Sequence, residues 1–228
     1  MTPPTDPADL PTLAWDRDEP LLAAVRRTGA PQLDVYPWTD VAVVIGRGGR
    51  QALEVDRAAI AADGVPFYRR PGGGCAVVLD PGNAVLSVGL PLPGIGGITG
   101  AFAAVSTWLA AALDRCGLPG IAQRGVSDLV LGERKIGGSC IWRTRGLLYY
   151  STTLLVDPDL DLCERYLPHP PREPDYRAGR THRAFMGSLR GAGWSGDVAA
   201  LAGALHIAAA DNLTELGQSC AGSQDNAG

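Results

Sequence analysis

Apolar and polar positions follow helical or strand periods along most of this chain, and the pattern divides it into elements. Residues 98–115 have the apolar spacing and the length of an amphipathic helix, which Cys116-Gly117 ends. Shorter helices are expected over 19–27 and 55–62, and an alanine-rich helix over about 197–216. Apolar runs bounded by glycine or proline predict strands at 42–46, 67–70, 76–79, 84–90, 128–131 and 147–156, with Pro91 and Pro93 ending the fourth.

Strands outnumber helices in this pattern, and several follow one another without a helix between them. We therefore expect an α+β fold, with a mixed, largely antiparallel sheet and helices packed on it. The glycine run 72–74 joins two strands, and Gly132-Glu133-Arg134 makes a hairpin between the strand at 128–131 and one that starts at Lys135. Residues 1–18 and 218–228 are polar or rich in proline, so both are expected to be flexible around a folded region at 19–217.

Composition and charge narrow the class of partner. The 228 residues are 46% apolar, enough for a sizeable core, and the formal charge of −4 with a pI near 5.3 argues against a nucleic-acid-binding surface. No apolar run approaches the roughly 18 residues of a membrane span, and residues 1–6 lack the features of a signal peptide, so no membrane association and a cytoplasmic location are expected. The five cysteines form no C-x-x-C pair and no zinc-ligand spacing with the histidines, which favours reduced thiols.

Two groups of residues are candidates for chemistry. Arg69 and Arg70 precede the glycine run, whose unshielded N–H groups suit a carbonyl or an anion; the simpler interpretation is a solvated arginine pair beside a flexible turn. Lys135 follows Asp128 by seven residues, a spacing that can bring ammonium and carboxylate together on a hairpin and neutralise charge on a phosphoryl or acyl-phosphate group. The simpler interpretation there is an exposed lysine paired with Glu133.

Cysteines and arginines elsewhere add weaker candidates. Cys75 and Cys140 are either nucleophiles or small residues at positions where glycine or alanine would also fit. Residues 176–183 hold three arginines and a histidine, which make either a loop that closes over phosphates or a solvated loop.

Four motifs, in this order, resemble those of the lipoate–protein ligase family, within the group that also includes biotin–protein ligases and octanoyltransferases. They are Ile45-Gly46-Arg47, the stretch from Arg69 to Asn83 with its glycine run, Asp128-Leu129-Val130, and Arg134-Lys135 followed by Gly138-Ser139. The similarity covers roughly residues 21–189, and linked motifs in the family's order are far more specific than one glycine run.

The resemblance implies a biotin/lipoate ligase-like catalytic domain, with a class II aminoacyl-tRNA synthetase-like fold, over 19–217. The sequence departs from the family in ending near the point where many ligases continue into a small accessory domain, so no C-terminal accessory domain is expected. The resemblance also implies a reaction in two steps. ATP and lipoate (or octanoate), with Mg²⁺, give the acyl-adenylate and pyrophosphate, and the acyl group then passes to a specific lysine of a lipoyl-acceptor protein domain. Adenylate formation depends either on a separate small accessory subunit or on none.

Roles for individual residues follow from the same resemblance. Lys135 would hold the acyl-phosphate oxygens, Asp128 would assist Lys135 or bind Mg²⁺, and the loop 177–183 would close over the adenylate. The residues that it assigns to the substrate and adenylate site are Arg70, Gly72, Gly73, Gly74, Cys75, Ala76, Asn83, Gly138, Ser139, Arg180 and Arg183.

Departures from the family pattern keep other functions open. Cys75 stands at the third glycine of the family triplet, Leu79 replaces a histidine, and Tyr149-Tyr150 lies where relatives often have a His-His pair. The alternatives are an octanoyltransferase that uses a cysteine thioester and no ATP, a biotin ligase, and a non-catalytic lipoate- or adenylate-binding protein.

Overall fold

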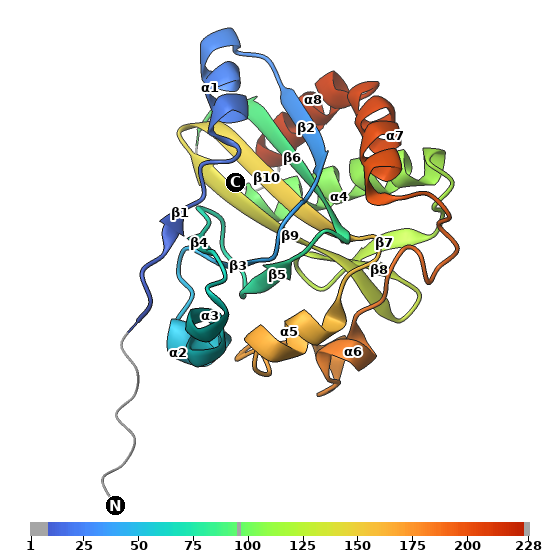
Figure 1. Ribbon diagram of the computed structural model, residues 1–228. Coiled ribbons are helices and arrows are strands. Elements are labelled where there is room, and N and C mark those ends of the chain that lie inside the picture. Colours follow the sequence, from blue (N-terminus) through green and yellow to red (C-terminus); the bar gives the residue numbers. More distant parts are fainter. Residues whose placement is uncertain (1–8, 95–96, 226–228) are drawn as a thin grey trace, which may run out of the picture.

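The computed structural model describes residues 9–94 and 97–225, and its strands form two sheets (Figure 1). Among these residues the larger sheet has six strands in the order β2-β6-β10-β9-β8-β7, with every pair antiparallel. The smaller sheet has the order β1-β4-β3-β5, with two parallel pairs and one antiparallel pair. The predicted α+β fold class is confirmed, although the strands are divided between two sheets.

The strands of the larger sheet are β2 (Gln32–Pro37), β6 (Asn83–Leu92), β7 (Ile121–Arg124), β8 (Asp128–Leu131), β9 (Arg134–Thr144) and β10 (Gly146–Leu155). The strands predicted at 128–131 and 147–156 are present as β8 and β10. However, β6 continues through Pro91, which we expected to end it. Proline is tolerated there because β2 begins opposite Gly89, so β6 has a single neighbouring strand beyond that point.

The strands of the smaller sheet are β1 (Leu13–Ala14), β3 (Ala42–Ile45), β4 (Phe67–Arg69) and β5 (Val77–Leu79). Both β4 and β5 pair with β3 and lie on opposite sides of it. The glycine run therefore crosses the end of β3 at Ile45 and does not join two neighbouring strands in a hairpin. Such a crossing brings one backbone close to another, which favours glycine.

The helices are α1 (Glu19–Thr28), α2 (Gln51–Glu54), α3 (Arg57–Asp63), α4 (Ile98–Arg115), α5 (Leu160–Tyr166), the 3-10 helix η1 (Asp175–Arg177), α6 (His182–Phe185), α7 (Val198–Ala210) and α8 (Leu213–Asp225). The helix predicted at 98–115 is confirmed as α4. The single helix expected over 197–216 is two helices, because the chain bends near Asn212 so that both Leu205 and Leu216 reach the core. Helix α8 also extends through 218–225, where we expected a flexible tail; residues 226–228 lie outside the described residues.

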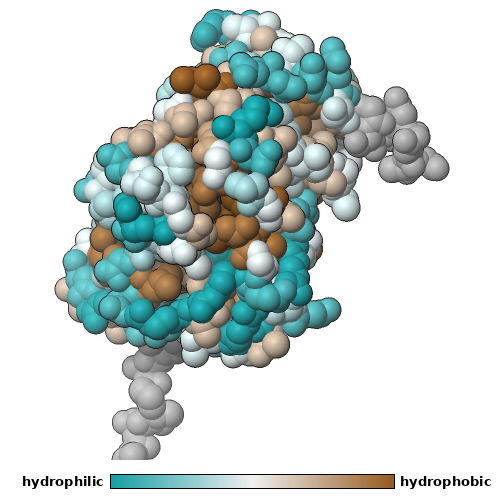
Figure 2. Space-filling model, turned by 90° about the vertical axis from the view of Figure 1, so that its right-hand side faces the viewer, coloured by the Kyte–Doolittle hydropathy of each residue, from teal (hydrophilic) through white to brown (hydrophobic). Residues whose placement is uncertain are grey.

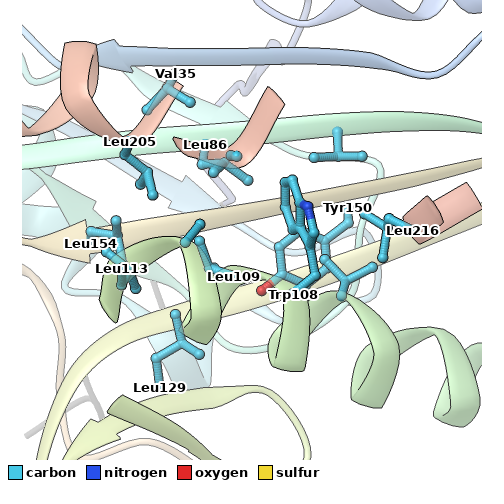
Figure 3. Packing of buried hydrophobic residues seen from close by; sticks show 14 of the residues in the cluster. Val35, Leu86, Trp108, Leu109, Leu113, Leu129, Tyr150, Leu154, Leu205 and Leu216 are labelled. Carbon is cyan, nitrogen blue, oxygen red and sulfur yellow. The ribbon is translucent and has the colours of Figure 1, made fainter. Parts of the chain in front are cut away.

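Helices α4, α7 and α8 cover one face of the larger sheet and bury the main core against it (Figure 1). Figure 3 shows Trp108 and Leu109 of α4 pointing toward strand residues that include Leu86 and Tyr150. Burial of this much apolar surface is the largest stabilising contribution to the fold. The sheet is thereby held as a fixed support for whatever lies on its other face.

The other face of the larger sheet packs against α1 and the smaller sheet. Leu22 of α1 packs in one cluster with Tyr149 of β10. Val85 of β6 packs in another with Val44 and Leu79 of the smaller sheet. The glycine run and the Lys135–Asp128 pair lie on this side, where loops from the two sheets meet.

Part of the N-terminal segment that we expected to be flexible is held against the sheets. Residues Leu13–Ala14 form β1, which pairs with β4. The Asp18 carboxylate is buried and accepts hydrogen bonds from Tyr149 Oη (2.5 Å) and Trp15 Nε1 (2.6 Å). Because a buried carboxylate needs such donors, the packed region begins before residue 19. Residues 1–8 lie outside the described residues.

The face shown in Figure 2 is polar around its edge and has apolar atoms gathered near its centre. None of the helices in the described part of the chain combines the length and the hydropathy needed to cross a membrane.

Candidate active site

The glycine run packs directly against backbone and side chains of both sheets. Gly72 packs closely against Cys140 of β9. A Cβ built on Gly72 would be only 2.6 Å from the Cys140 Sγ. A Cβ built on Gly46, directly after β3, would be 2.2 Å from the Gly74 carbonyl oxygen. At Gly73, by contrast, a Cβ would meet no described atom within 4 Å. The run is therefore packed at its ends and open at its centre.

Arg69 and Arg70 hold the loops around this run. Arg69 Nη1 donates to three carbonyls of the turn after β3, those of Gly46, Arg47 and Gly49. Arg70 donates through Nε and both Nη atoms to carbonyls at 2.7–3.2 Å, those of Val44, Gly73 and Cys75. We expected Arg70 to line the acyl and phosphate site, but each of its side-chain nitrogens already has a carbonyl partner. In this structure Arg70 positions the run.

The end of the run is fixed by a residue that the sequence reasoning missed. Glu54 of α2 accepts the Ala76 N–H at 2.9 Å through one carboxylate oxygen and the Arg50 N–H at 3.0 Å through the other. The Cys75 thiol lies 3.8 Å from the Arg172 carbonyl oxygen, so the segment after α5 passes over the run. No local pattern marks Glu54, because its partner is 22 residues away.

Lys135 and Asp128 form an ion pair where β8 and β9 meet. Lys135 Nζ lies 2.6 Å from Asp128 Oδ1, and the two side chains are 24% and 12% exposed. Glu133 pairs with Arg124 at 2.9 Å and not with the lysine. Gly138 leaves room for the ammonium, since a Cβ there would be 3.1 Å from Nζ. The predicted approach of ammonium to carboxylate is therefore present, while the catalytic roles of the pair stay a prediction.

A β-bulge decides which face of the sheet carries Lys135. Strands β8 and β9 change register between Leu129 and Val130, which leaves Ile136 as an extra residue in β9. Side chains of a strand alternate between faces, and a regular strand would place Lys135 on the face covered by the helices. The extra residue moves it to the face of Asp128.

Ser139 points to the opposite face from its neighbours. Its hydroxyl lies 2.7 Å from Tyr150 Oη, and Tyr150 belongs to the core under α4. Gly138 lies beside the lysine side chain, and Cys140 lies under Gly72. Of the Gly138-Ser139 pair expected in the site, the structure places the glycine there and turns the serine hydroxyl away.

Asp128 has a second partner that the sequence did not reveal. Tyr176 Oη donates to Asp128 Oδ2 at 2.7 Å. Burial, together with the hydrogen bond to Asp128 and its charge, raises the pKa of Tyr176 well above the usual range, so the hydroxyl remains a donor. Both oxygens of Asp128 thus have donors, and no group of three or more His, Cys, Asp or Glu residues in the described part of the chain could hold a metal. Because Mg²⁺ is usually held by one or two carboxylates together with substrate phosphates, a role of Asp128 as a Mg²⁺ ligand stays a prediction.

The arginines expected to close over an adenylate have local partners. Arg180 donates at 2.7–3.1 Å to the carbonyls of Glu133, Tyr176 and Arg177. Arg183 pairs with Asp161 at the start of α5, and its side chain is half-exposed. Arg177 differs from both, because its side chain is almost completely buried.

A family model described as the lipoyl protein ligase A/B catalytic domain matches residues 11–204. The chain belongs to this family. The matched range contains the glycine run and the β8–β9 hairpin, so the resemblance stated from the motifs is confirmed.

Curated relatives in the lipoyl protein ligase A/B family carry two kinds of name. A lipoate–protein ligase of Streptococcus pyogenes serotype M5 is 26% identical over 157 residues, which are 68% of this chain and 45% of that protein. Octanoyltransferase LipM of Kyrpidia tusciae is 27% identical over 195 residues, covering 75% of this chain and 70% of that protein. The chain spans about half the length of the lipoate–protein ligases that it matches.

Solved structures of lipoate ligases share the fold. The bi-partite lipoate protein ligase of Thermoplasma acidophilum, described together with its E2 lipoyl domain, has a TM-score of 0.71 at 23% identity and covers 95% of this chain and 91% of that chain. A lipoate-protein ligase A bound with ATP has a TM-score of 0.69 at 23% identity, with coverage of 96% and 93%.

Three of the residues that depart from the family pattern, Leu79, Tyr149 and Tyr150, are buried here. Leu79, which replaces a histidine, is 2% exposed and packs between the sheets. Tyr149 and Tyr150 point to opposite faces, one toward Asp18 and the other toward the α4 core. Leu79 fills its place with apolar atoms, whereas the two tyrosines keep hydroxyl groups where the lipoate ligase motif often has imidazoles.

Asn83 lies at the start of β6 and is completely buried. Its Oδ1 accepts the Asp80 N–H at 3.1 Å, and the Asp80 carboxylate accepts the N–H groups of Gly82 and Asp159. Burial raises the pKa of Asp80. These bonds close the turn between the two sheets through Asn83 Oδ1, whereas the buried Asn83 Nδ2 has no partner among the described residues. The expected place of Asn83 in the substrate site stays a prediction.

The candidate thiols differ in access. All five cysteines are free thiols, as the sequence predicted, and Cys140 is 8% exposed. Burial raises the pKa of the Cys140 thiol, which opposes formation of the nucleophilic thiolate. Cys75, directly after the glycine run, is half-buried.

Two surface cavities lie elsewhere. One of about 480 Å³ lies beside Trp15, Trp38 and Tyr68, and one of about 500 Å³ lies between α4 and α8. Neither is lined by the glycine run or by Lys135. The glycine run and the ion pair thus lie apart from these two cavities.

Proposed function

We propose that this chain activates lipoate, or octanoate, with ATP to the acyl-adenylate and transfers the acyl group to a lysine of a lipoyl-acceptor domain. Membership of the family supports an enzyme of the lipoate ligase and octanoyltransferase group. A structural neighbour bound with ATP, and another described with its E2 lipoyl domain, support the choice of nucleotide and acceptor.

The position of Lys135 carries the proposal. The sequence has 20 lysine and arginine residues, and Lys135 is its single lysine. It is part-buried on Asp128, on the sheet face that the glycine run covers at Cys140. An ammonium is a compact charge with three donors, whereas a guanidinium is a planar fork. A chain that otherwise uses arginine has a lysine at the one place where several oxygens would converge on a cation.

Both steps of the proposed reaction need a cation beside oxygen atoms. In the first step a lipoate carboxylate oxygen attacks the α-phosphorus of ATP, and the bond to the bridging oxygen breaks to release pyrophosphate. In the second step the acceptor amine attacks the acyl carbonyl, loses a proton, and the bond to AMP breaks. Negative charge develops on oxygen in both steps, and donors already held in place stabilise it most. Asp128 holds Lys135 ready; Mg²⁺ would arrive on the ATP phosphates.

Lys135→Met tests the proposal directly. Purified protein is mixed with lipoate, Mg-ATP and a lipoyl domain, and pyrophosphate release and acceptor mass are followed. We expect the variant to fold and to lose about 10²–10³ in rate, as for the loss of one preorganised donor. Lys135→Arg keeps the charge and should recover little. Near-normal turnover of Lys135→Met would contradict the assignment. Because the chain has no other lysine, acyl-lysine elsewhere in the mixture belongs to the acceptor.

The octanoyltransferase relative favours a second candidate, acyl transfer through a cysteine thioester without ATP. The buried Cys140 and its raised pKa support the ligase over this candidate. Two further reactions separate them: one without ATP, and one with Cys140→Ser. Transfer that needs no ATP and is abolished by Cys140→Ser would replace the ligase proposal.

The same assay addresses the accessory subunit. Adenylation by this chain alone would show that a separate subunit is not required. Pyrophosphate release that appears only when a candidate small subunit is added would show that it is.

A further inference from the structure

Arg177 has a buried side-chain donor without a partner. It ends η1 and its side chain is 6% exposed. Among the described residues, nothing accepts a hydrogen bond from its Nη2, and that atom is buried. A buried donor without a partner typically costs about 1–3 kcal/mol, and more when it is charged. Such a group in a native protein calls for an explanation.

The rest of the guanidinium is held in place. Arg177 Nε donates to the Arg180 carbonyl at 3.0 Å and lies 3.4 Å from Glu173 Oε2. Its Cζ lies 4.9 Å from the centre of the Phe185 ring. Because three contacts fix the plane of the group, the unpartnered nitrogen is not the end of a loose side chain.

The groups around Arg177 come from both halves of the candidate active site. The titratable groups that act on its charge are Glu173, Asp128, Cys75 and Arg180. Cys75 directly follows the glycine run, and its thiol lies 3.8 Å from the Arg172 carbonyl oxygen. Asp128 accepts a hydrogen bond from Tyr176, the residue before Arg177. Arg177 therefore lies where the run from one sheet approaches the ion pair of the other.

Arg180 and Arg183, the other arginines of residues 176–183, do not have a free buried donor of this kind. Arg180 uses its donors on carbonyls, and Arg183 pairs with Asp161. Burial lowers the pKa of Arg177, as expected for a cation that has too few partners. An anion would supply the missing acceptor.

We propose that Arg177 is a nucleotide-binding residue whose Nη2 donates to a phosphoryl oxygen of ATP. This rests on the proposed function, because it assigns the phosphate to the same site as Lys135. The resemblance places the loop 177–183 over the adenylate and assigns Arg180 and Arg183 to the site; the proposal names Arg177 as the arginine of that loop that contacts a phosphate.

Binding of Mg-ATP and of adenosine to Arg177→Gln tests the inference without turnover. Both ligands are titrated into wild type, Arg177→Gln and Arg26→Gln by calorimetry. Arg26→Gln is the matched control, an exposed arginine on α1 paired with Glu19. We expect Arg177→Gln to weaken ATP by about 10–100-fold, as for a lost hydrogen bond to a charged group, and adenosine by less than about twofold. The control should bind both as wild type does.

The possible binding results separate the Arg177 inference from the proposed function. Equal ATP affinity in Arg177→Gln and wild type would overturn the inference alone. Equal loss of ATP and adenosine would also overturn it, because a merely structural role affects both ligands. Wild type that binds no ATP, either alone or with a candidate small subunit, would overturn the proposed function as well. If Arg177→Gln does not fold, Arg177→Lys takes its place; it keeps the charge but loses the fork, so unchanged ATP affinity there would refute the contact.

Discussion

Replacing each glycine of the run 72–74 with alanine, one at a time, tests how closely each position is packed and how strained an alanine would be there. In Gly72→Ala the new methyl would lie 2.6 Å from the Cys140 Sγ and 2.8 Å from its Cβ, so the loop or the sheet must move. Overpacking of this kind costs about 1–3 kcal/mol. Gly74 has a φ of 89°, where alanine is strained by about 1–2 kcal/mol. Gly73 faces open space, so Gly73→Ala should change the unfolding free energy by less than about 0.5 kcal/mol.

Thermal unfolding followed by circular dichroism measures these differences. For a chain of this length 1 kcal/mol corresponds to about 2–4 °C, so Gly72→Ala should lower Tm by roughly 2–12 °C and Gly73→Ala by less than about 2 °C. Cys140→Gly removes both clashing atoms, whereas Cys140→Ala leaves the Cβ in place. A double-mutant cycle should therefore show that Cys140→Gly, and not Cys140→Ala, reduces the cost of Gly72→Ala.

Two results would refute the reasoning. Equal losses for Gly72→Ala and Gly73→Ala would mean that the run is not packed at one end and open at its centre. Absence of coupling between positions 72 and 140 would mean that the run does not rest on β9. Gly73→Ala also reports on function: a stable variant with lower ATP-dependent activity would place the substrate against the open part of the run.

Two further predictions concern buried tyrosines. Tyr149→Phe removes a donor to the buried Asp18 carboxylate and should lower the free energy of unfolding by about 1–3 kcal/mol in urea titrations; an unchanged midpoint would show that the bond contributes nothing. Unfolded tyrosine ionises near pH 10, whereas burial raises the pKa of Tyr150 to about 12 and that of Tyr176 well above its usual range. The folded chain then keeps protons that the unfolded chain has lost, so stability is full below pH 10 and falls toward pH 12; urea titrations at pH 8, 10 and 11 measure the fall, and a flat profile would contradict it.

Local features of the sequence predicted the local structure well. The periodicity of residues 98–115 indicated a helix that the structure contains, and the seven-residue spacing from Asp128 to Lys135 around a glycine turn indicated a close ion pair. Both depend on interactions between residues near each other in the chain. Helix periodicity and hairpin turns are visible in sequence for that reason.

Features that depend on distant residues were not predictable from one sequence. The contact of Gly72 with Cys140, the hydrogen bond of Tyr176 to Asp128, and the division of strands into two sheets all join segments far apart in the chain. Residue types also conceal their partners. Arg70 has the donors to bind a phosphate, and in the fold those donors are directed to backbone carbonyls.

The bulge in β9 separates the face on which Lys135 lies from the number of residues in the hairpin. Because Ile136 is accommodated as the extra residue, Lys135 lies opposite Val130, on the face of Asp128. Deletion of Ile136 would restore simple alternation and leave Lys135 opposite Val130, on that same face. Over evolutionary time, the hairpin of this enzyme can therefore gain or lose this one residue and keep the ion pair.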